Sequence, residues 1–314
     1  MLGRTANGVF WMFRYLERAE NCARLLDAGF RLALTRGAGV AEHEWRSVLI
    51  TLGMDAEYRL SNADFNRADV TDFILRGKDN QGSVLNMLAN ARTNARAVRT
   101  ALTREVWEAT NDCWMQLKDT LARPVRQSDF QDVLATIRRH ATLVRGAMEG
   151  TMLRNEIFNF ARLGTFLERA DNTARILDVK YYVLLPAVNW VGSSLDNMQW
   201  ETVLRSVSGE RAFAWLNSGA MDPPSIARFL ILDGRFPRSL VFCYRKVGSN
   251  MQSLAGEYGF ETSAHAMVRN AQIALGDSTI DGIFANGLHE FIGAFLTGNR
   301  CIADAIAADY RFAA

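Results

Sequence analysis

One segment of this chain occurs twice, and that repeat restricts the fold more than any other feature. Residues 16–27 read LERAENCARLLD and residues 167–178 read LERADNTARILD, which differ by Glu/Asp, Cys/Thr and Leu/Ile exchanges. Further pairs follow in the same order: WRSVL at 45–49 and WETVL at 200–204, Phe73 and Phe229, Ser83 and Ser239, Asn94 and Asn250. The offset between partners drifts from 151 (16 to 167) to 156 (83 to 239). A duplication followed by small loop insertions predicts this drift.

The spacing of apolar residues predicts that the repeated segments are helical. At about 100° per residue, the stretch from Phe10 to Phe30 has one broad apolar face and a narrow polar stripe. The apolar face contains Met12, Tyr15, Leu16, Ala19, Ala23, Leu26 and Phe30, and the stripe contains Arg14, Glu17, Asn21 and Arg24. The chain has five prolines, and long stretches without proline permit helices. The alternation of polar and apolar residues that indicates strands is scarce.

We therefore expect an all-α protein made of two tandem copies of a helical bundle unit of about 150 residues. Residues 1–150 form the first copy and residues 151–314 the second, packed as one compact pseudo-two-fold domain. Besides the repeated helices, we expect helices near 41–60, 70–77, 81–105, 106–121, 127–148, 152–183, 195–218, 225–233, 237–256, 262–275 and 283–311. Asp69 and Ser225 are predicted N-caps, and Asp222-Pro223-Pro224 is a predicted break between helices.

Charge and motif content argue against several functional classes. The 36 basic and 34 acidic residues nearly balance, which disfavours nucleic-acid binding. The four cysteines are far apart and the four histidines have no HExxH or ExxH spacing, so we expect no metal. No nucleotide-binding glycine motif occurs, and we expect no cofactor. The chain begins without a secretory signal, and its most apolar run, 181–191, is too short to span a bilayer. These features predict a cytoplasmic protein without membrane contact.

The repeated polar stripe supplies the candidate site. Glu17, Asn21 and Arg24 in the first copy match Glu168, Asn172 and Arg175 in the second, and Arg18 and Arg169 flank the stripes. Three interpretations remain open: a solvated helix face, a buried ion-pair network between the copies, or a cleft in which arginines bind a carboxylate or phosphate. The position equivalent to Arg14 is Thr165, so any site is asymmetric. Arg154 precedes the second copy of the motif and has no clear equivalent in the first.

Several segments resemble the bacterial Alpha-E family, a helical group named for a recurring Glu-Arg motif. They are RTANGVFWMFRYLERAENCARLLD near the start, MLRNEIFNFARLGTFLERADNTARILDVKYY at 152–182, QWETVLRSVSG at 199–209, FLILDGRFPRSL at 229–240 and GLHEFIGAFL at 287–296. The resemblance thus spans nearly the whole chain. Two positions differ from the pattern of the family: Thr165 stands where it has Arg, and Gln81-Gly82 replaces an Asn-Pro-like turn.

The resemblance implies a biochemical context. Proteins of this family are typically encoded beside a circularly permuted ATP-grasp amidoligase, often with a transglutaminase-like peptidase, which suggests a pathway for peptide-like amide bonds. One hypothesis is therefore a non-catalytic partner or scaffold of the ligase. The alternative is an enzyme acting on a peptide or amino-acid-like substrate. In that case Glu17 or Glu168 is the general acid or base, and Arg14, Arg24 and Arg175 bind carboxylates. The oligomeric state is left open.

Overall fold

The computed structural model describes residues 3–36, 41–60, 64–183, 194–217 and 221–312, and all its regular elements are helices. The first half contains α1 (Gly3–Arg36), α2 (Ala41–Leu52), α3 (Asp55–Leu60), α4 (Arg67–Arg76), α5 (Val84–Ala97), α6 (Arg104–Thr120) and α7 (Phe130–Thr151). The second contains α8 (Glu156–Val183), α9 (Ser194–Ser206), α10 (Glu210–Leu216), α11 (Pro223–Leu232), α12 (Leu240–Tyr258), α13 (Ser263–Asp277), α14 (Ile280–Asn286) and α15 (Leu288–Asp309). Two short 3₁₀ turns, Arg99–Ala101 and Gln127–Asp129, complete the set. The all-α prediction is confirmed.

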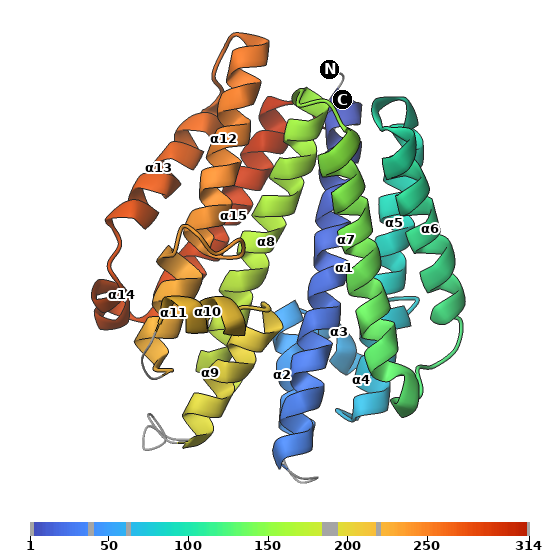
Figure 1. The fold of residues 1–314 in the computed structure, drawn as a ribbon, viewed down its shortest axis with the longest axis vertical. Helices are drawn as coiled ribbons and strands as arrows, with labels where there is room; N and C mark the ends of the chain where they lie inside the picture. The colour runs from blue at the N-terminus through green and yellow to red at the C-terminus, as the bar shows by residue number, and fades with distance from the viewer. Residues whose placement is uncertain (1–2, 37–40, 61–63, 184–193, 218–220, 313–314) are drawn as a thin grey trace.

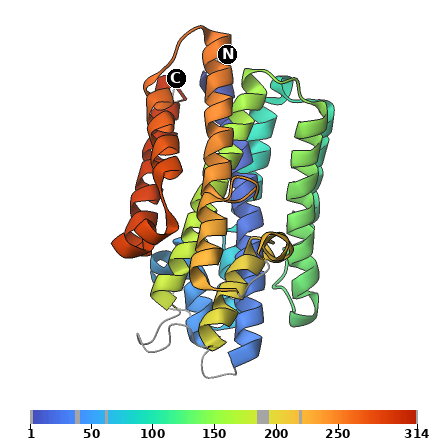
Figure 2. The ribbon, with the colours of Figure 1, turned by 60° about the vertical axis from the view of Figure 1, so that its left-hand side comes forward.

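Eight of the helices form two groups of four. One helix from each group, α1 or α8, belongs to the central pair. In the first group α1 packs against α5 and α7, and α6 packs against both of these. In the second group α8 packs against α12 and α15, and α13 packs against both. Helices α1 and α8 contact each other along the middle of the molecule (Figure 1). Seen from the side, α12, α13 and α15 lie on one flank of this pair and α5, α6 and α7 on the other (Figure 2).

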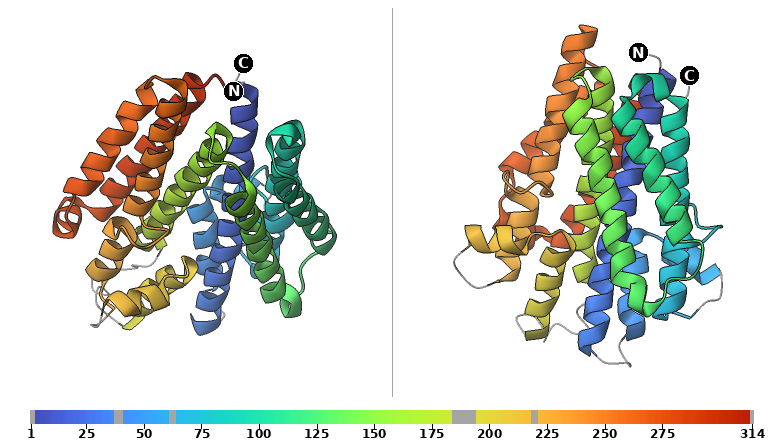
Figure 3. Two further views of the ribbon diagram at one scale, coloured as in Figure 1. Left: turned by 45° about the horizontal axis from the view of Figure 1, so that its top comes forward. Right: turned by 45° about the vertical axis from the view of Figure 1, so that its right-hand side comes forward.

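The two central helices approach closely at a glycine. A Cβ atom added to Gly164 of α8 would lie 2.2 Å from the carbonyl oxygen of Phe10 in α1. No side chain other than hydrogen fits such a distance, so the absence of a side chain here lets the two backbones pack together. The left view of Figure 3 shows α8 beside α1, which it contacts. This crossing fixes which side chains of the two repeated segments can meet.

The predicted helix over 41–60 is two helices, and so is the one over 195–218. Helix α2 ends at a turn in which Gly53 has φ of +72°, and α9 ends at a turn in which Ser208 has φ of +56°. The turns form matching backbone hydrogen bonds: Gly53 N–H donates to Ile50 O, and Ser208 N–H donates to Arg205 O. The two positions are 155 residues apart, within the offset range of the repeat. A left-handed residue ends a helix, and apolar periodicity alone does not reveal it.

Both predicted N-caps are wrong by three residues. Helix α4 is capped by Asn66, whose side chain accepts from the backbone N–H of Asp69. Helix α11 is capped by Asp222, which accepts from the backbone N–H of Ser225. The predicted break between helices falls at the start of α11, whose first turn contains Pro223 and Pro224. Proline is tolerated there because the first N–H groups of a helix lack intrahelical acceptors. Ser83 and Ser239 cap the equivalent helices α5 and α12.

Candidate functional site

The two Glu-Arg pairs bind each other across the α1–α8 contact. Arg169 donates to both carboxylate oxygens of Glu17, from Nε and Nη2, at 2.9 Å each. Arg18 donates in the same way to Glu168, from Nε at 2.6 Å and from Nη2 at 2.9 Å. Each glutamate of one segment is therefore held by the arginine of the other. Such bidentate pairs fix the relative orientation of the two side chains and the distance between them, because the two N–H groups of a guanidinium match the two oxygens of a carboxylate.

Further arginines surround Glu17 and form a larger cluster, which we call the Glu17 cluster. It consists of Glu17, Glu20 and Arg24 from α1, Arg145 from α7, Arg169 from α8 and Arg238 from the turn before α12. Arg238 bridges the two carboxylates, with Nη1 at 3.0 Å from Glu17 and Nη2 at 3.0 Å from Glu20. Arg145 also contacts both carboxylates. Four guanidinium groups thus surround two carboxylates, which leaves two positive charges in excess.

This charge excess sets the ionisation of the Glu17 cluster. Burial alone raises the pKa of the Glu17 carboxyl, but the charges of Arg169, Arg238 and Arg145 outweigh burial and hold that pKa well below 4.5. The pKa of Glu20 is also lowered, by Arg238, Arg145 and Arg24, against the effects of burial and of Glu17. Burial and the neighbouring arginines lower the pKa of Arg238 to about 10, although Glu17 opposes them. Glu17, Glu20 and Arg238 are therefore charged at neutral pH.

The second cluster, which we call the Glu168 cluster, contains Glu168, Arg14 and Arg18. Arg14 donates from Nε to Glu168 Oε2 at 2.9 Å, beside the two hydrogen bonds from Arg18. The pKa of Glu168 is about 2, because the two arginines outweigh the effect of burial. At the equivalent of Arg14, the hydroxyl of Thr165 donates to the backbone oxygen of Ala161. The predicted asymmetry is present in the geometry, since Arg145 and Arg238 reach Glu17 instead.

The polar stripe does not face solvent. The side chains of Glu17 and Glu168 are each 1 % exposed. Helices α8 and α7 cover the stripe of α1, and α1 and α12 pack around that of α8. Single-helix periodicity cannot distinguish a polar stripe in water from one that faces a second charged helix. Of the three open interpretations, this geometry matches the buried ion-pair network.

The remaining stripe residues lie farther along the same two helices. Arg24 donates to Glu20 and, from Nη1 at 2.5 Å, to the hydroxyl of Ser208 in the turn after α9. Arg175 donates to Asp171 at 2.6 Å and lies beside Gly53, at the equivalent turn after α2. Asn21 and Asn172 are buried, and Asn21 Oδ1 and Asn172 Nδ2 have no hydrogen-bond partner among the described residues. The two repeated segments thus place matching arginines against matching turns.

Arg154 is separate from this assembly. Its guanidinium donates to the backbone oxygen of Glu149 at 2.6 Å and lies 4.0 Å from the ring centre of Phe158. Conversely, sequence analysis missed Arg145 and Arg238 as members of the Glu17 cluster. Arg238 directly precedes the N-cap Ser239, where the first copy has Gly82 before Ser83. That local difference was the available signal for an extra arginine in one copy.

Within the described ranges, no group of three or more His, Cys, Asp or Glu side chains is arranged to hold a metal ion. In the same residues, no helix combines the length and apolarity required to cross a membrane.

Comparison with known families gives one match. The family model for Alpha-E, described as a predicted alpha-helical domain with a conserved ER motif, matches residues 1–310. No curated protein and no solved structure matches the chain. The ER motif of that description corresponds here to Glu17-Arg18 and Glu168-Arg169, the residues that pair across the central contact.

Proposed function

The chain belongs to the Alpha-E family, and we propose that it acts as a non-catalytic partner or scaffold of an ATP-grasp amidoligase. The proposed setting is the cytoplasm, in a pathway that makes or modifies a peptide-like product, with a transglutaminase-like peptidase as a second partner. One observation carries the proposal. The Glu-Arg motif is used inside the molecule, where each glutamate holds an arginine of the other half. The ligase and the peptidase enter from the family resemblance described above.

The state of the two glutamates favours this proposal over the alternative of an enzyme that acts on a peptide or amino-acid-like substrate. Both oxygens of Glu17 and both oxygens of Glu168 accept arginine hydrogen bonds. A general acid or base needs a pKa near the working pH and access to the substrate proton. The pKa of Glu168 is about 2, and its side chain is buried. A buried carboxylate that stays ionised and accepts arginine hydrogen bonds at both oxygens supports a structural role.

The two functions predict different outcomes for the substitution Glu17→Gln. If Glu17 is a catalytic acid or base, the variant stays folded and loses turnover. If Glu17 anchors the buried cluster, the variant loses stability because several arginines lose their counter-charge. Thermal unfolding followed by circular dichroism distinguishes the two outcomes without knowledge of any substrate. A variant as stable as the wild type would remove the observation on which the proposal rests.

The partner itself is tested by co-purification. The tagged chain is recovered from its native host, and the retained proteins are identified by mass spectrometry. We expect an ATP-grasp ligase to be retained at micromolar protein concentration. Absence of the ligase, at expression and folding equal to those of a control bait, would contradict the proposal.

An exposed tryptophan offers a way to locate the contact surface. Trp215 on α10 is 83 % exposed, and tryptophan is enriched among the residues that dominate binding energy at interfaces. Leu60 on α3 is also 83 % exposed and serves as the matched control. We expect Trp215→Ser to reduce ligase retention and Leu60→Ser to leave it unchanged. Equal retention by both variants would exclude α10 as the contact while leaving the co-purification result intact.

A further inference from the structure

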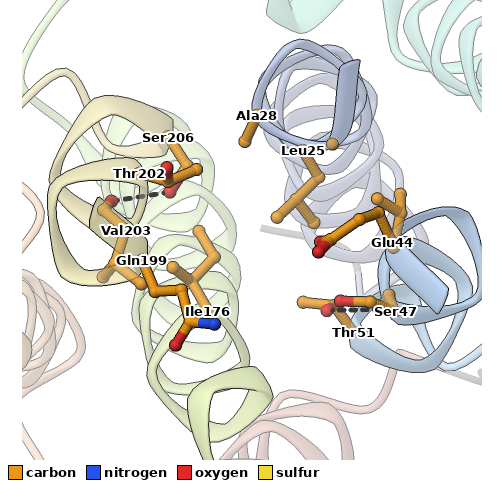
Figure 4. Close-up of a pocket in the computed structure, with 12 residues that line it drawn as sticks. Leu25, Ala28, Glu44, Ser47, Thr51, Ile176, Gln199, Thr202, Val203 and Ser206 are labelled. Carbon is orange, nitrogen blue, oxygen red and sulfur yellow. Dashed lines mark hydrogen bonds between the residues drawn. The ribbon is translucent and has the colours of Figure 1, made fainter. Parts of the chain in front are cut away.

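A charged cleft opens beside a small pocket between α1 and α9. In that pocket, whose volume is about 40 Å³, Ala28 of α1 and Ser206 of α9 lie on opposite walls (Figure 4). Their neighbours in sequence, Asp27 and Arg205, line the cleft, which has a volume of about 630 Å³. Pockets that bind small molecules typically have volumes of about 300–1,000 Å³. The cleft is therefore large enough for a small molecule.

Arginines dominate both walls of this cleft. The four arginines in its lining are Arg31 and Arg138 on the side of α1 and α7, and Arg205 and Arg211 on the side of α9 and α10. The acidic residues in the lining are Asp27 and Glu210. Four guanidinium groups thus accompany two carboxylates, so the lining carries two positive charges in excess.

The ion pairs of the cleft leave arginine donors unused on both walls. On the first wall a single carboxylate, that of Asp27, serves both arginines. On the second wall Arg205 pairs with Glu210 and also with Glu201, which does not line the cleft. Arg211 is exposed and forms no ion pair or hydrogen bond with any described residue. Because a guanidinium group has five N–H donors, the paired arginines also keep donors for a ligand.

Ser208 adds a hydroxyl donor to the lining of the cleft. Its left-handed φ of +56° is costly for a residue other than glycine, and such strain is frequent at functional sites. The Ser208 Oγ accepts from Arg24, and its own O–H donates to no described residue. Through Arg24 the cleft adjoins the Glu17 cluster, whose two excess positive charges add to the positive potential of the cleft.

The repeat indicates that the helices do not need these arginines in order to fold. The offset of 155 that relates WRSVL to WETVL gives Ile50 and Ala56 as the equivalents of Arg205 and Arg211, and the offset of 151 gives Tyr182 as that of Arg31. Both acidic positions stay acidic, with Asp178 equivalent to Asp27 and Asp55 equivalent to Glu210. A requirement of the repeated helices would apply to both segments. Arginines present in only one of them are expected for a binding site.

We propose that this cleft binds a small dicarboxylate, with one carboxylate on each wall. Its two negative charges match the two positive charges in excess, and guanidinium groups bind carboxylates through paired N–H donors. The size of the cleft favours two separated groups over a single phosphate. One water needs roughly 10–15 Å³ of such a volume, so a phosphate would leave most of the cleft unfilled. This binding activity is independent of the ligase partnership.

The test measures binding of small anions to the full chain by isothermal titration calorimetry. The probes are the straight-chain dicarboxylates from succinate to pimelate, with butyrate as a monocarboxylate and inorganic phosphate as a compact dianion. Ionic strength is held constant, because salt screens exposed charges. We expect the best dicarboxylate to bind about tenfold or more tightly than butyrate or phosphate. Equal or tighter binding of either of these two probes would overturn the proposal.

Variants of the two walls locate the site. Arg211→Gln on one wall and Arg138→Gln on the other should each weaken binding of the best dicarboxylate by about tenfold. Because Arg211 is exposed and has no partner among the described residues, circular dichroism should show an intact fold for its variant. Arg300 on α15 is exposed and unpaired in the same sense, so Arg300→Gln is the matched control and should leave the affinity unchanged. Unaltered affinity in Arg211→Gln, or an equal loss in Arg300→Gln, would overturn the proposal.

Discussion

At the scale of single residues, Glu168 is the simplest buried charge to test, because its carboxylate is held by two arginines of α1. Replacing it with glutamine removes the charge while keeping the shape, and leaves Arg14 and Arg18 without their counter-charge. Breaking a buried pair in this way costs about 3–5 kcal/mol. We expect Glu168→Gln to lower the free energy of unfolding by that amount in urea denaturation. Glu108→Gln, which removes the partner of Arg104 in a surface pair, should cause no measurable change.

The same residue predicts an acid dependence of stability. The pKa of Glu168 falls from 4.5 to about 2 on folding. A carboxyl whose pKa is lower in the folded state contributes its full stabilisation above pH 4.5 and loses it as the pH falls toward 2. At about 1.4 kcal/mol per pKa unit, this contribution is about 3 kcal/mol. We therefore expect the free energy of unfolding to fall steeply below pH 5, and Glu168→Gln to flatten that decline. Parallel pH profiles of variant and wild type would contradict the assignment.

At the scale of helices, the close crossing of α1 and α8 makes Gly164 intolerant of a side chain. Alanine would place a Cβ against the carbonyl oxygen of Phe10, and overpacking of this kind costs about 1–3 kcal/mol. Gly146 in α7 is the matched control, because a Cβ there meets nothing within 4 Å. We expect Gly164→Ala to destabilise the protein and Gly146→Ala to stabilise it by about 0.5–1 kcal/mol, through helix propensity. Thermal unfolding that ranks the two variants in the opposite order would refute the crossing geometry.

Helix type was predictable from the sequence, and helix ends were not. Apolar periodicity found the long helices because it reports burial of one face. It missed the ends of α2 and α9, which depend on left-handed residues at Gly53 and Ser208. It could not decide between a solvated and a buried stripe at Glu17, because the partner helix lies about 150 residues away in sequence.

At the scale of the whole molecule, the ion pairs make each half incomplete without the other. Glu17 forms ion pairs with Arg169 and Arg238 of the second half, and both arginines that pair with Glu168 belong to the first half. A half expressed alone would contain glutamates lacking these partners, together with the uncovered apolar faces of α1 or α8. The dependence of each half on the other rests on these contacts alone, whether or not the repeat arose by duplication.

We therefore expect fragments 1–153 and 154–314, divided between α7 and α8, to be poorly folded separately and to regain helicity when mixed. Glu168 in the second fragment lacks Arg14 and Arg18, and Glu17 in the first keeps Arg145 but lacks Arg169 and Arg238. The mixture restores the reciprocal Glu-Arg pairs. Circular dichroism and size-exclusion chromatography would follow the assembly. Glu168→Gln in the second fragment should weaken the complex, and Glu108→Gln in the first should not. Two fragments that fold cooperatively alone and fail to associate would show that the central ion pairs do not hold the halves together.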